Sequence, residues 1–95
     1  MTSKKVNIHS SRVLHTEDNE TLAKIAQKFN SNIWLEFQGK RAKAKSVINV
    51  LALALYGNTK ITISADGTDE AAAIEALETY IQSGFSKDVA KGLLK

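Results

Sequence analysis

Cysteine and proline are both absent from this 95-residue chain, and each absence excludes a class of structure. Without cysteine the protein has no disulfides and no thiolate metal sites. Without proline, chain reversals depend on glycine, asparagine and aspartate. No apolar run is long enough for a signal peptide or a membrane span, so we expect a cytoplasmic protein without membrane insertion.

The chain is also poor in the charge clusters and ligand clusters that mark many functional sites. The formal net charge is +3 and the pI is about 9.3, whereas nucleic-acid binders concentrate basic residues far more. The two histidines, His9 and His15, have no further ligand at metal-binding spacing, and no nucleophile–base pair is present. We therefore expect no direct nucleic-acid partner, no metal, no cofactor and no autonomous enzymatic turnover.

The periodicity of apolar residues predicts four elements in the first half of the chain. Val6 and Ile8 alternate with polar residues, which indicates a short half-buried strand. Helical spacing from Glu17 onwards predicts a helix with Thr16 as its N-cap. The residues with this spacing are Leu22, Ile25, Ala26 and Phe29. Residues 32–45 then alternate on both sides of Gln38-Gly39, which predicts two strands joined by a turn.

The second half predicts a helix, a strand, a helix and a tail. Ser46 can cap a helix that ends near Gly57-Asn58, and an alternating strand follows over residues 60–66. Thr68 is the expected cap of the last helix, which Gly84 ends. Residues 86–95 show no clear pattern, so we expect one folded domain over 1–85 and a flexible C-terminal tail over 86–95.

The order of these elements, β-α-β-β-α-β-α, predicts an α+β fold. Its simplest form is an open-faced β-sandwich, a four-stranded antiparallel sheet with three helices on one face. The other face would then be open and would carry Trp34, Arg41 and Lys43. The helix after Ser46 is apolar almost all round, so it is either fully buried or leaves an apolar face for a partner.

Three stretches, KFNSNIWLEFQGK, AKSVINVLALAL and ITISADGTDEAAAIEALE, resemble HPr, the histidine-containing phosphocarrier family of the bacterial sugar phosphotransferase system. The resemblance runs without gaps over about residues 4–85. It implies that His15 is the phosphoryl acceptor and that Ser46 is the serine that a kinase phosphorylates in Gram-positive members. It also implies that Val47, Ile48 and Leu51 form a partner-docking surface.

The chain departs from the family beside the active histidine. The family motif His-Ala-Arg-Pro-Ala reads here His15-Thr16-Glu17-Asp18-Asn19. A phosphohistidine carries close to two negative charges and is held by helix N-terminal amides and preferably by an arginine. Glu17 and Asp18 put the wrong sign of charge there, so we expect phosphoryl acceptance to fall by roughly tenfold or more.

Three functions therefore follow from the sequence. The first is a regulatory module controlled by phosphorylation of Ser46, whose partners are a serine kinase or a transcriptional regulator. The second is a phosphocarrier that takes phosphate onto His15 from enzyme I and passes it to sugar-specific components. The third is an interaction module that is never phosphorylated and uses the sheet face around Trp34. The sequence leaves open whether the first strand exchanges between two protomers.

Overall fold

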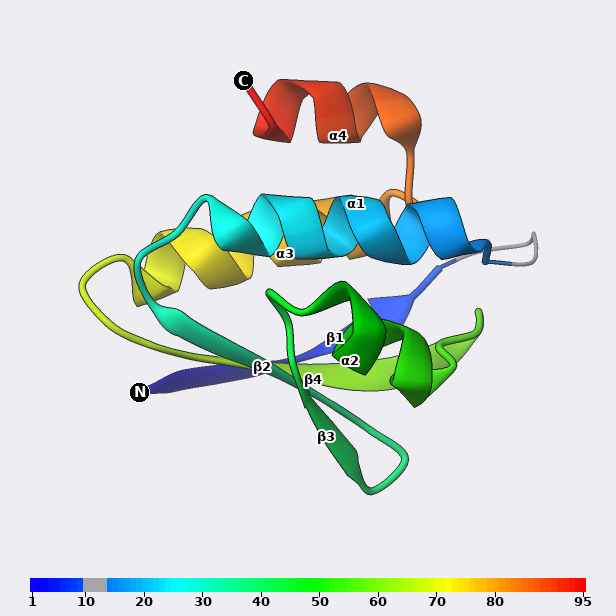
Figure 1. The fold of residues 1–95 in the computed structure, drawn as a ribbon, viewed down its shortest axis with the longest axis horizontal. Coiled ribbons are helices and arrows are strands. Elements are labelled where there is room, and N and C mark those ends of the chain that lie inside the picture. Colours follow the sequence, from blue (N-terminus) through cyan, green and yellow to red (C-terminus); the bar gives the residue numbers. More distant parts are fainter. Residues whose placement is uncertain (10–13) are drawn as a thin grey trace.

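A computed structural model describes residues 1–9 and 14–95 of the chain. Its strands pair antiparallel in the order β1-β4-β2-β3. The expected α+β fold is confirmed, with one additional helix at the C-terminal end (Figure 1). In chain order the elements are β1 (Thr2–Ile8), α1 (Thr16–Gln27), β2 (Asn32–Phe37), β3 (Lys40–Lys43), α2 (Val47–Leu53), β4 (Thr59–Asp66), α3 (Glu70–Gln82) and α4 (Lys87–Leu93).

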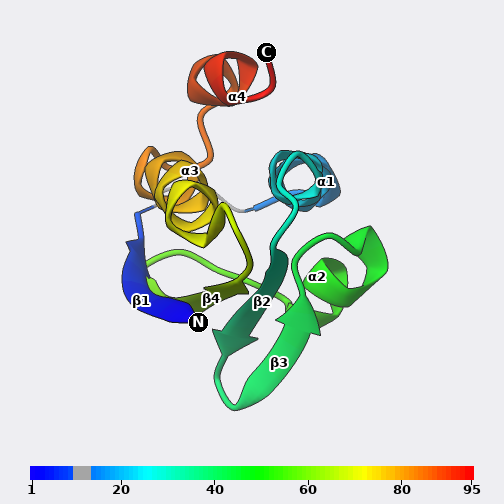
Figure 2. The same cartoon turned by 90° about the vertical axis from the view of Figure 1, so that its left-hand side faces the viewer.

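The helices form a layer on one face of the sheet. Helices α1 and α3 lie side by side over the strands, α2 lies beside β3, and α4 forms an outer layer beyond α1 and α3 (Figure 2). Within the described residues, no helix is both long and apolar enough to cross a membrane. The N-terminal ends of α1 and α4 carry the residues of the candidate functional site.

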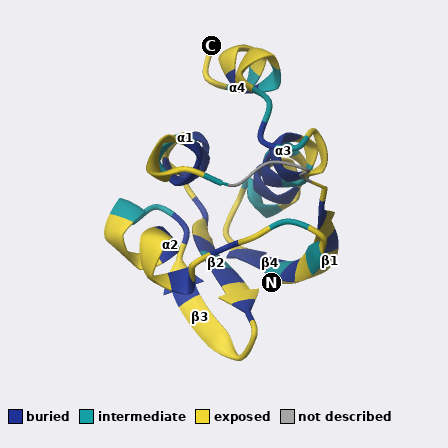
Figure 3. Ribbon diagram, turned by 90° about the vertical axis from the view of Figure 1, so that its right-hand side faces the viewer, coloured by how far each residue is buried: buried dark blue, intermediate teal, exposed yellow. Residues whose placement is uncertain are grey.

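The opposite face of the sheet is open to solvent, as the sequence predicted. Strand β3 is exposed along most of its length (Figure 3). Trp34 pairs with Lys43 across the two neighbouring strands, and the Arg41 guanidinium carbon lies 4.8 Å from the centroid of the Trp34 ring. A cation over an indole face is attracted by the ring quadrupole, so Arg41 partly covers Trp34.

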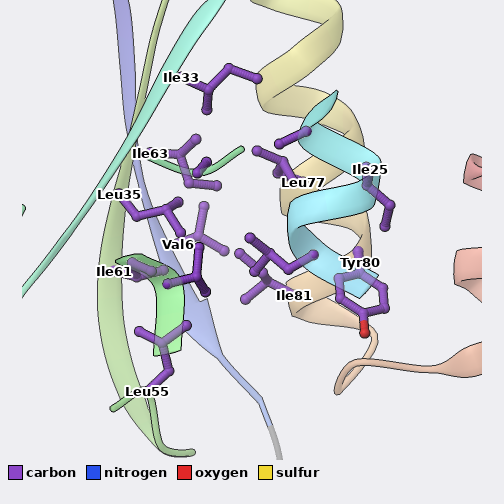
Figure 4. Packing of buried hydrophobic residues seen from close by; sticks show 14 of the residues in the cluster. Val6, Ile25, Ile33, Leu35, Leu55, Ile61, Ile63, Leu77, Tyr80 and Ile81 are labelled. Carbon is purple, nitrogen blue, oxygen red and sulfur yellow. The ribbon is translucent and has the colours of Figure 1, made fainter. Parts of the chain in front are cut away.

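The core lies between the sheet and the helices (Figure 4). Alternate residues of each strand point into it because side chains in a strand alternate between the two faces. The register places Val6 opposite Ile61, and Leu35 opposite both Ile63 and Ala42. Helix α3 contributes Tyr80, which is 1% exposed. This packing sets the position of α1, and with it His15.

Three helix boundaries differ from the sequence-based prediction. The N-cap of α1 is His15 rather than Thr16, and the N-cap of α3 is Asp69 rather than Thr68. Helix α2 ends at Leu53, well before Gly57-Asn58, because Ala54 adopts a left-handed conformation with φ 54°. Leaving the helix at that point allows the buried Leu55 to reach the core.

A fourth helix, α4, occupies the segment for which the sequence predicted no element. Its cap, Ser86, accepts a hydrogen bond from the Val89 amide at 3.4 Å. Ala90 is buried and Leu93 packs against the core, while the Lys28 ammonium donates to the Leu93 carbonyl at 3.0 Å. The predicted element order, which contained three helices, therefore missed the fourth. The flexibility of residues 86–95 stays a prediction.

The Asp69 carboxylate joins the start of α3 to the start of β2. It accepts hydrogen bonds from the Asn30 amide at 2.8 Å and the Ser31 amide at 2.9 Å, and from the Ser31 hydroxyl. These bonds, led by the one from the Ser31 hydroxyl, lower the pKa of Asp69 below its ordinary value. Hydrogen bonds to an ionised carboxylate favour the charged form.

We expect this carboxylate to make stability depend on acid pH. A carboxyl whose pKa is lower in the folded chain stabilises the fold above its unfolded pKa and loses that contribution as the pH falls through the folded pKa. For Asp69 the loss therefore occurs below about pH 4. Urea unfolding at about pH 6 and about pH 3 should show a smaller decrease in the midpoint for Asp69→Asn than for the parent protein.

Asp88→Asn, which removes an exposed carboxylate from α4, is the control for this measurement. It should keep the pH dependence of the parent protein. Glu70, whose pKa is lowered chiefly by a hydrogen bond from the Thr2 hydroxyl, contributes in the same direction and remains in both variants. An unchanged pH dependence in Asp69→Asn would contradict the assignment.

Candidate functional site

His15 lies exposed at the N-terminal end of α1, in an extended backbone conformation. Its carbonyl oxygen accepts hydrogen bonds from the Asp18 amide at 3.0 Å and from the Asn19 side-chain amide at 3.1 Å. Its own N–H donates to the Asp18 carboxylate at 2.7 Å. Two of the residues that depart from the family motif thus fix the backbone of His15.

The Asp18 carboxylate is turned towards the chain rather than towards solvent. Asp18 is only 4% exposed, and its carbonyl accepts a hydrogen bond from the Tyr80 hydroxyl at 3.2 Å. An acid at the third helical position that bonds back to the N-cap amide is one half of a capping box. From the sequence, Asp18 was expected to repel a phosphate on His15. In the structure its carboxylate instead caps α1 by accepting the hydrogen bond from the His15 amide.

Glu17 is exposed, and its carboxylate lies 3.5 Å from the Lys87 ammonium. Lys87 is the first residue of α4, so this ion pair joins the N-terminal ends of two helices. His15, Glu17 and Lys87 line a single open hollow, together with the turn that precedes α4. No local pattern in the sequence pointed to Lys87, because it lies far from His15 along the chain.

His15 lies at the N-terminal end of α1, where its imidazole could receive an anionic group. Helix α1 is 12 residues long, and the N–H groups of its first turn point out of its N-terminal end, where the Asp18 amide already bonds to the His15 carbonyl at 3.0 Å. These amides and the positive end of the helix dipole favour a negatively charged group beside the N-cap. The arrangement can therefore hold an anionic group beside the exposed imidazole of His15.

Ser46 and the apolar residues after it form a second candidate site on α2. The Ser46 hydroxyl accepts a hydrogen bond from the Asn49 amide at 3.4 Å, which confirms the predicted N-cap. Ile48 is 80% exposed and Leu51 is 37% exposed, whereas Val50 on the opposite side is buried. Helix α2 therefore buries one side against the protein and leaves an apolar surface, with half-buried Val47 beside it.

The second histidine, His9, belongs to neither site. It is exposed just after the end of β1, beside Asn58 and Thr59. Residues 1–9 and 14–95 contain no group of three histidine or acidic side chains that could hold a metal ion.

Comparison with known proteins places this arrangement in a family. The family profile "PTS HPr component phosphorylation site" matches residues 2–83. The phosphocarrier protein HPr of Haemophilus influenzae is 44% identical over 81 residues, which cover 85% of this chain and 95% of that protein. Residues 84–95, including α4, lie outside the match to the family profile.

Two solved structures extend the comparison to three dimensions. HPr-C-His from Thermoanaerobacter tengcongensis is 33% identical with a TM-score of 0.82, over 90% of this chain and 96% of that one. Crh from Bacillus subtilis, a catabolite-repression protein seen as a domain-swapped dimer, is 31% identical with a TM-score of 0.69, over 92% and 100%. Here β1 pairs with β4 of its own chain. The protein therefore belongs to the HPr family of phosphocarrier proteins of the phosphotransferase system.

Proposed function

We propose that this HPr-family protein is a regulatory module in which phosphate on Ser46 controls docking at the apolar surface of α2. The observation that carries the proposal is the exposure of Ile48, at 80%, two residues after the cap serine. A contiguous exposed apolar patch on a folded protein often marks an interaction site. A phosphate on Ser46 would bring close to two negative charges to the edge of this surface and change which partner it accepts.

The partners expected for this function follow from the negative charge that phosphorylation would add at Ser46. A serine kinase would have to bind the region around Ser46, and a transcriptional regulator with basic groups beside an apolar pocket would recognise the phosphorylated form. Crh, a Bacillus subtilis catabolite-repression protein of the same fold, supports a regulatory role for a protein of this fold. In this role the protein is a substrate and a ligand, and it performs no turnover by itself.

Phosphorylation by the HPr serine kinase and ATP tests the proposal. Intact-mass measurement should show one acid-stable phosphate, and Ser46→Ala should abolish it. Ser86→Ala is a matched control because Ser86 also caps a helix, accepting a hydrogen bond from the Val89 amide at 3.4 Å. Acid-stable phosphate that persists in Ser46→Ala, or its complete absence from the parent protein, would contradict the regulatory role.

The second candidate function is phosphoryl transfer through His15, from enzyme I to the sugar-specific components. The inward position of the Asp18 carboxylate and the ion pair of Glu17 with Lys87 favour it, because both weaken the repulsion that the sequence implied. In the transfer, the bond between phosphorus and the donor breaks and a P–N bond to His15 forms. Incubation with enzyme I and phosphoenolpyruvate should then add one acid-labile phosphate.

The two incubations together distinguish the three functions. Acid-stable phosphate supports regulation and acid-labile phosphate supports the carrier. If neither reaction adds phosphate, the remaining function is an interaction module that uses the open sheet face around Trp34.

A further inference from the structure

We infer that Lys87 is an anion-binding residue of the His15 site, supplying the positive charge that the family's arginine would provide at position 17. This inference rests on the second candidate function, in which His15 accepts a phosphoryl group. It assigns to the segment beyond the family match, residues 84–95, a part in the phosphoryl-acceptor site.

The first observation is the position of Lys87 relative to His15. Its ammonium lies 3.5 Å from the Glu17 carboxylate, and both residues line the same hollow as His15. The side chains of Lys87 and Glu17 are 72% and 68% exposed, so both are free to change rotamer. An exposed ion pair is weak, and a doubly charged phosphoryl group would therefore draw the lysine away from Glu17.

The second observation is that packing fixes the start of α4 beside the start of α1. Phe85, which is fully buried, packs its ring edge-on against Tyr80 at 5.1 Å between centroids. The Tyr80 hydroxyl in turn donates to the Asp18 carbonyl in the first turn of α1. Buried contacts thus link the residue two before Lys87 to the residue three after His15.

The third observation is the balance of charge. Glu17 alone would add one negative charge beside a phosphohistidine that already carries close to two. Glu17 and Lys87 together form a neutral ion pair. The Asp18 carboxylate accepts a hydrogen bond from the His15 amide. Asp88 in the first turn of α4 is exposed as well. Among the described residues that line the hollow, Lys87 is the one lysine or arginine, and it offsets the charge of Glu17.

The test compares Lys87→Met with Lys91→Met, which removes the same charge from an exposed position one turn further along α4. Phosphoryl transfer to His15 is followed with two donors, phospho-enzyme I and phosphoramidate. With phosphoramidate the donor P–N bond breaks, ammonia leaves and a new P–N bond to the imidazole forms, without any protein docking. Lys87→Met should be slower by about fivefold with both donors, the size that one exposed charge contact supports.

Two further variants separate anion binding from a structural effect of Lys87. Lys87→Arg should keep the parent rate because it keeps the positive charge. In a Glu17→Arg background the effect of Lys87→Met should shrink to less than about twofold, because the arginine then supplies the charge. A structural role of Lys87 that does not depend on its ion pair with Glu17 would give the same loss in both backgrounds.

Each outcome decides between the proposals. Equal rates for Lys87→Met and Lys91→Met would overturn the role of Lys87. An adduct formed by phosphoramidate but not by enzyme I would contradict the carrier function and still measure the effect of Lys87. Failure of both donors to phosphorylate His15 in the parent protein would overturn the carrier function and the inference together.

Discussion

Replacing Tyr80 by alanine is expected to lower the free energy of unfolding by about 3–5 kcal/mol. Tyr80 is 1% exposed and is the largest fully buried side chain in the described part of the chain. Its ring packs against Phe85 with an interplanar angle of 71°. Because domains of this size are stable by only about 5–15 kcal/mol, the substitution removes a large fraction of the total.

Tyr80→Phe is the matched control, since it keeps the ring and removes only the hydroxyl. That hydroxyl donates to the Asp18 carbonyl at 3.2 Å, so the expected cost is about 0.5–1.5 kcal/mol. Urea unfolding followed by circular dichroism gives both values. Equal losses for the two variants would mean that the hydrogen bond, and not ring burial, accounts for the contribution of Tyr80.

Replacing Ile48 by aspartate is expected to weaken docking at α2 by about thirtyfold or more, the effect of losing a central apolar anchor. The substitution also places a negative charge in the apolar surface that Ile48, Leu51 and Val47 form. Because Ile48 is 80% exposed, the free energy of unfolding should change by less than about 0.5 kcal/mol. Titration calorimetry with enzyme I and with the serine kinase measures the affinity.

Ala72→Asp is the control for this prediction because it places the same charge at an exposed position on another helix, α3. It should leave both affinities unchanged. If Ile48→Asp binds both proteins as tightly as the parent protein does, the docking surface lies elsewhere, and the sheet face around Trp34 becomes the next candidate.

The sequence predicted the strands and their buried faces well because strand patterns are local. Ile33, Leu35 and Phe37 alternate with polar residues, and all three are buried in the structure. Helix caps were predicted less well. Thr68 was chosen because threonine caps helices, yet the N-cap of α3 is Asp69, whose carboxylate bonds across to Ser31. A bond between residues far apart in the chain leaves no trace in a local pattern.

For α2 the sequence left two alternatives, and the structure chose between them. The run from Val47 to Leu55 is apolar on almost every side, so periodicity did not indicate which side faces the core. Packing against β3 and α1 buries Val50 and Leu53 and leaves Ile48 exposed. The exposed apolar surface that we propose for docking is therefore a consequence of how the helix packs, as well as of its composition.

By itself the sequence determined the α+β fold and the HPr family of this protein, because both depend on patterns that neighbouring residues carry. Tertiary structure decided the charge around His15. It turned Asp18 inward as a cap and brought Lys87 to 3.5 Å from Glu17. The physical reason is that electrostatic energy depends on distance through space, and that distance is set by the packing of α4 on α1 and α3.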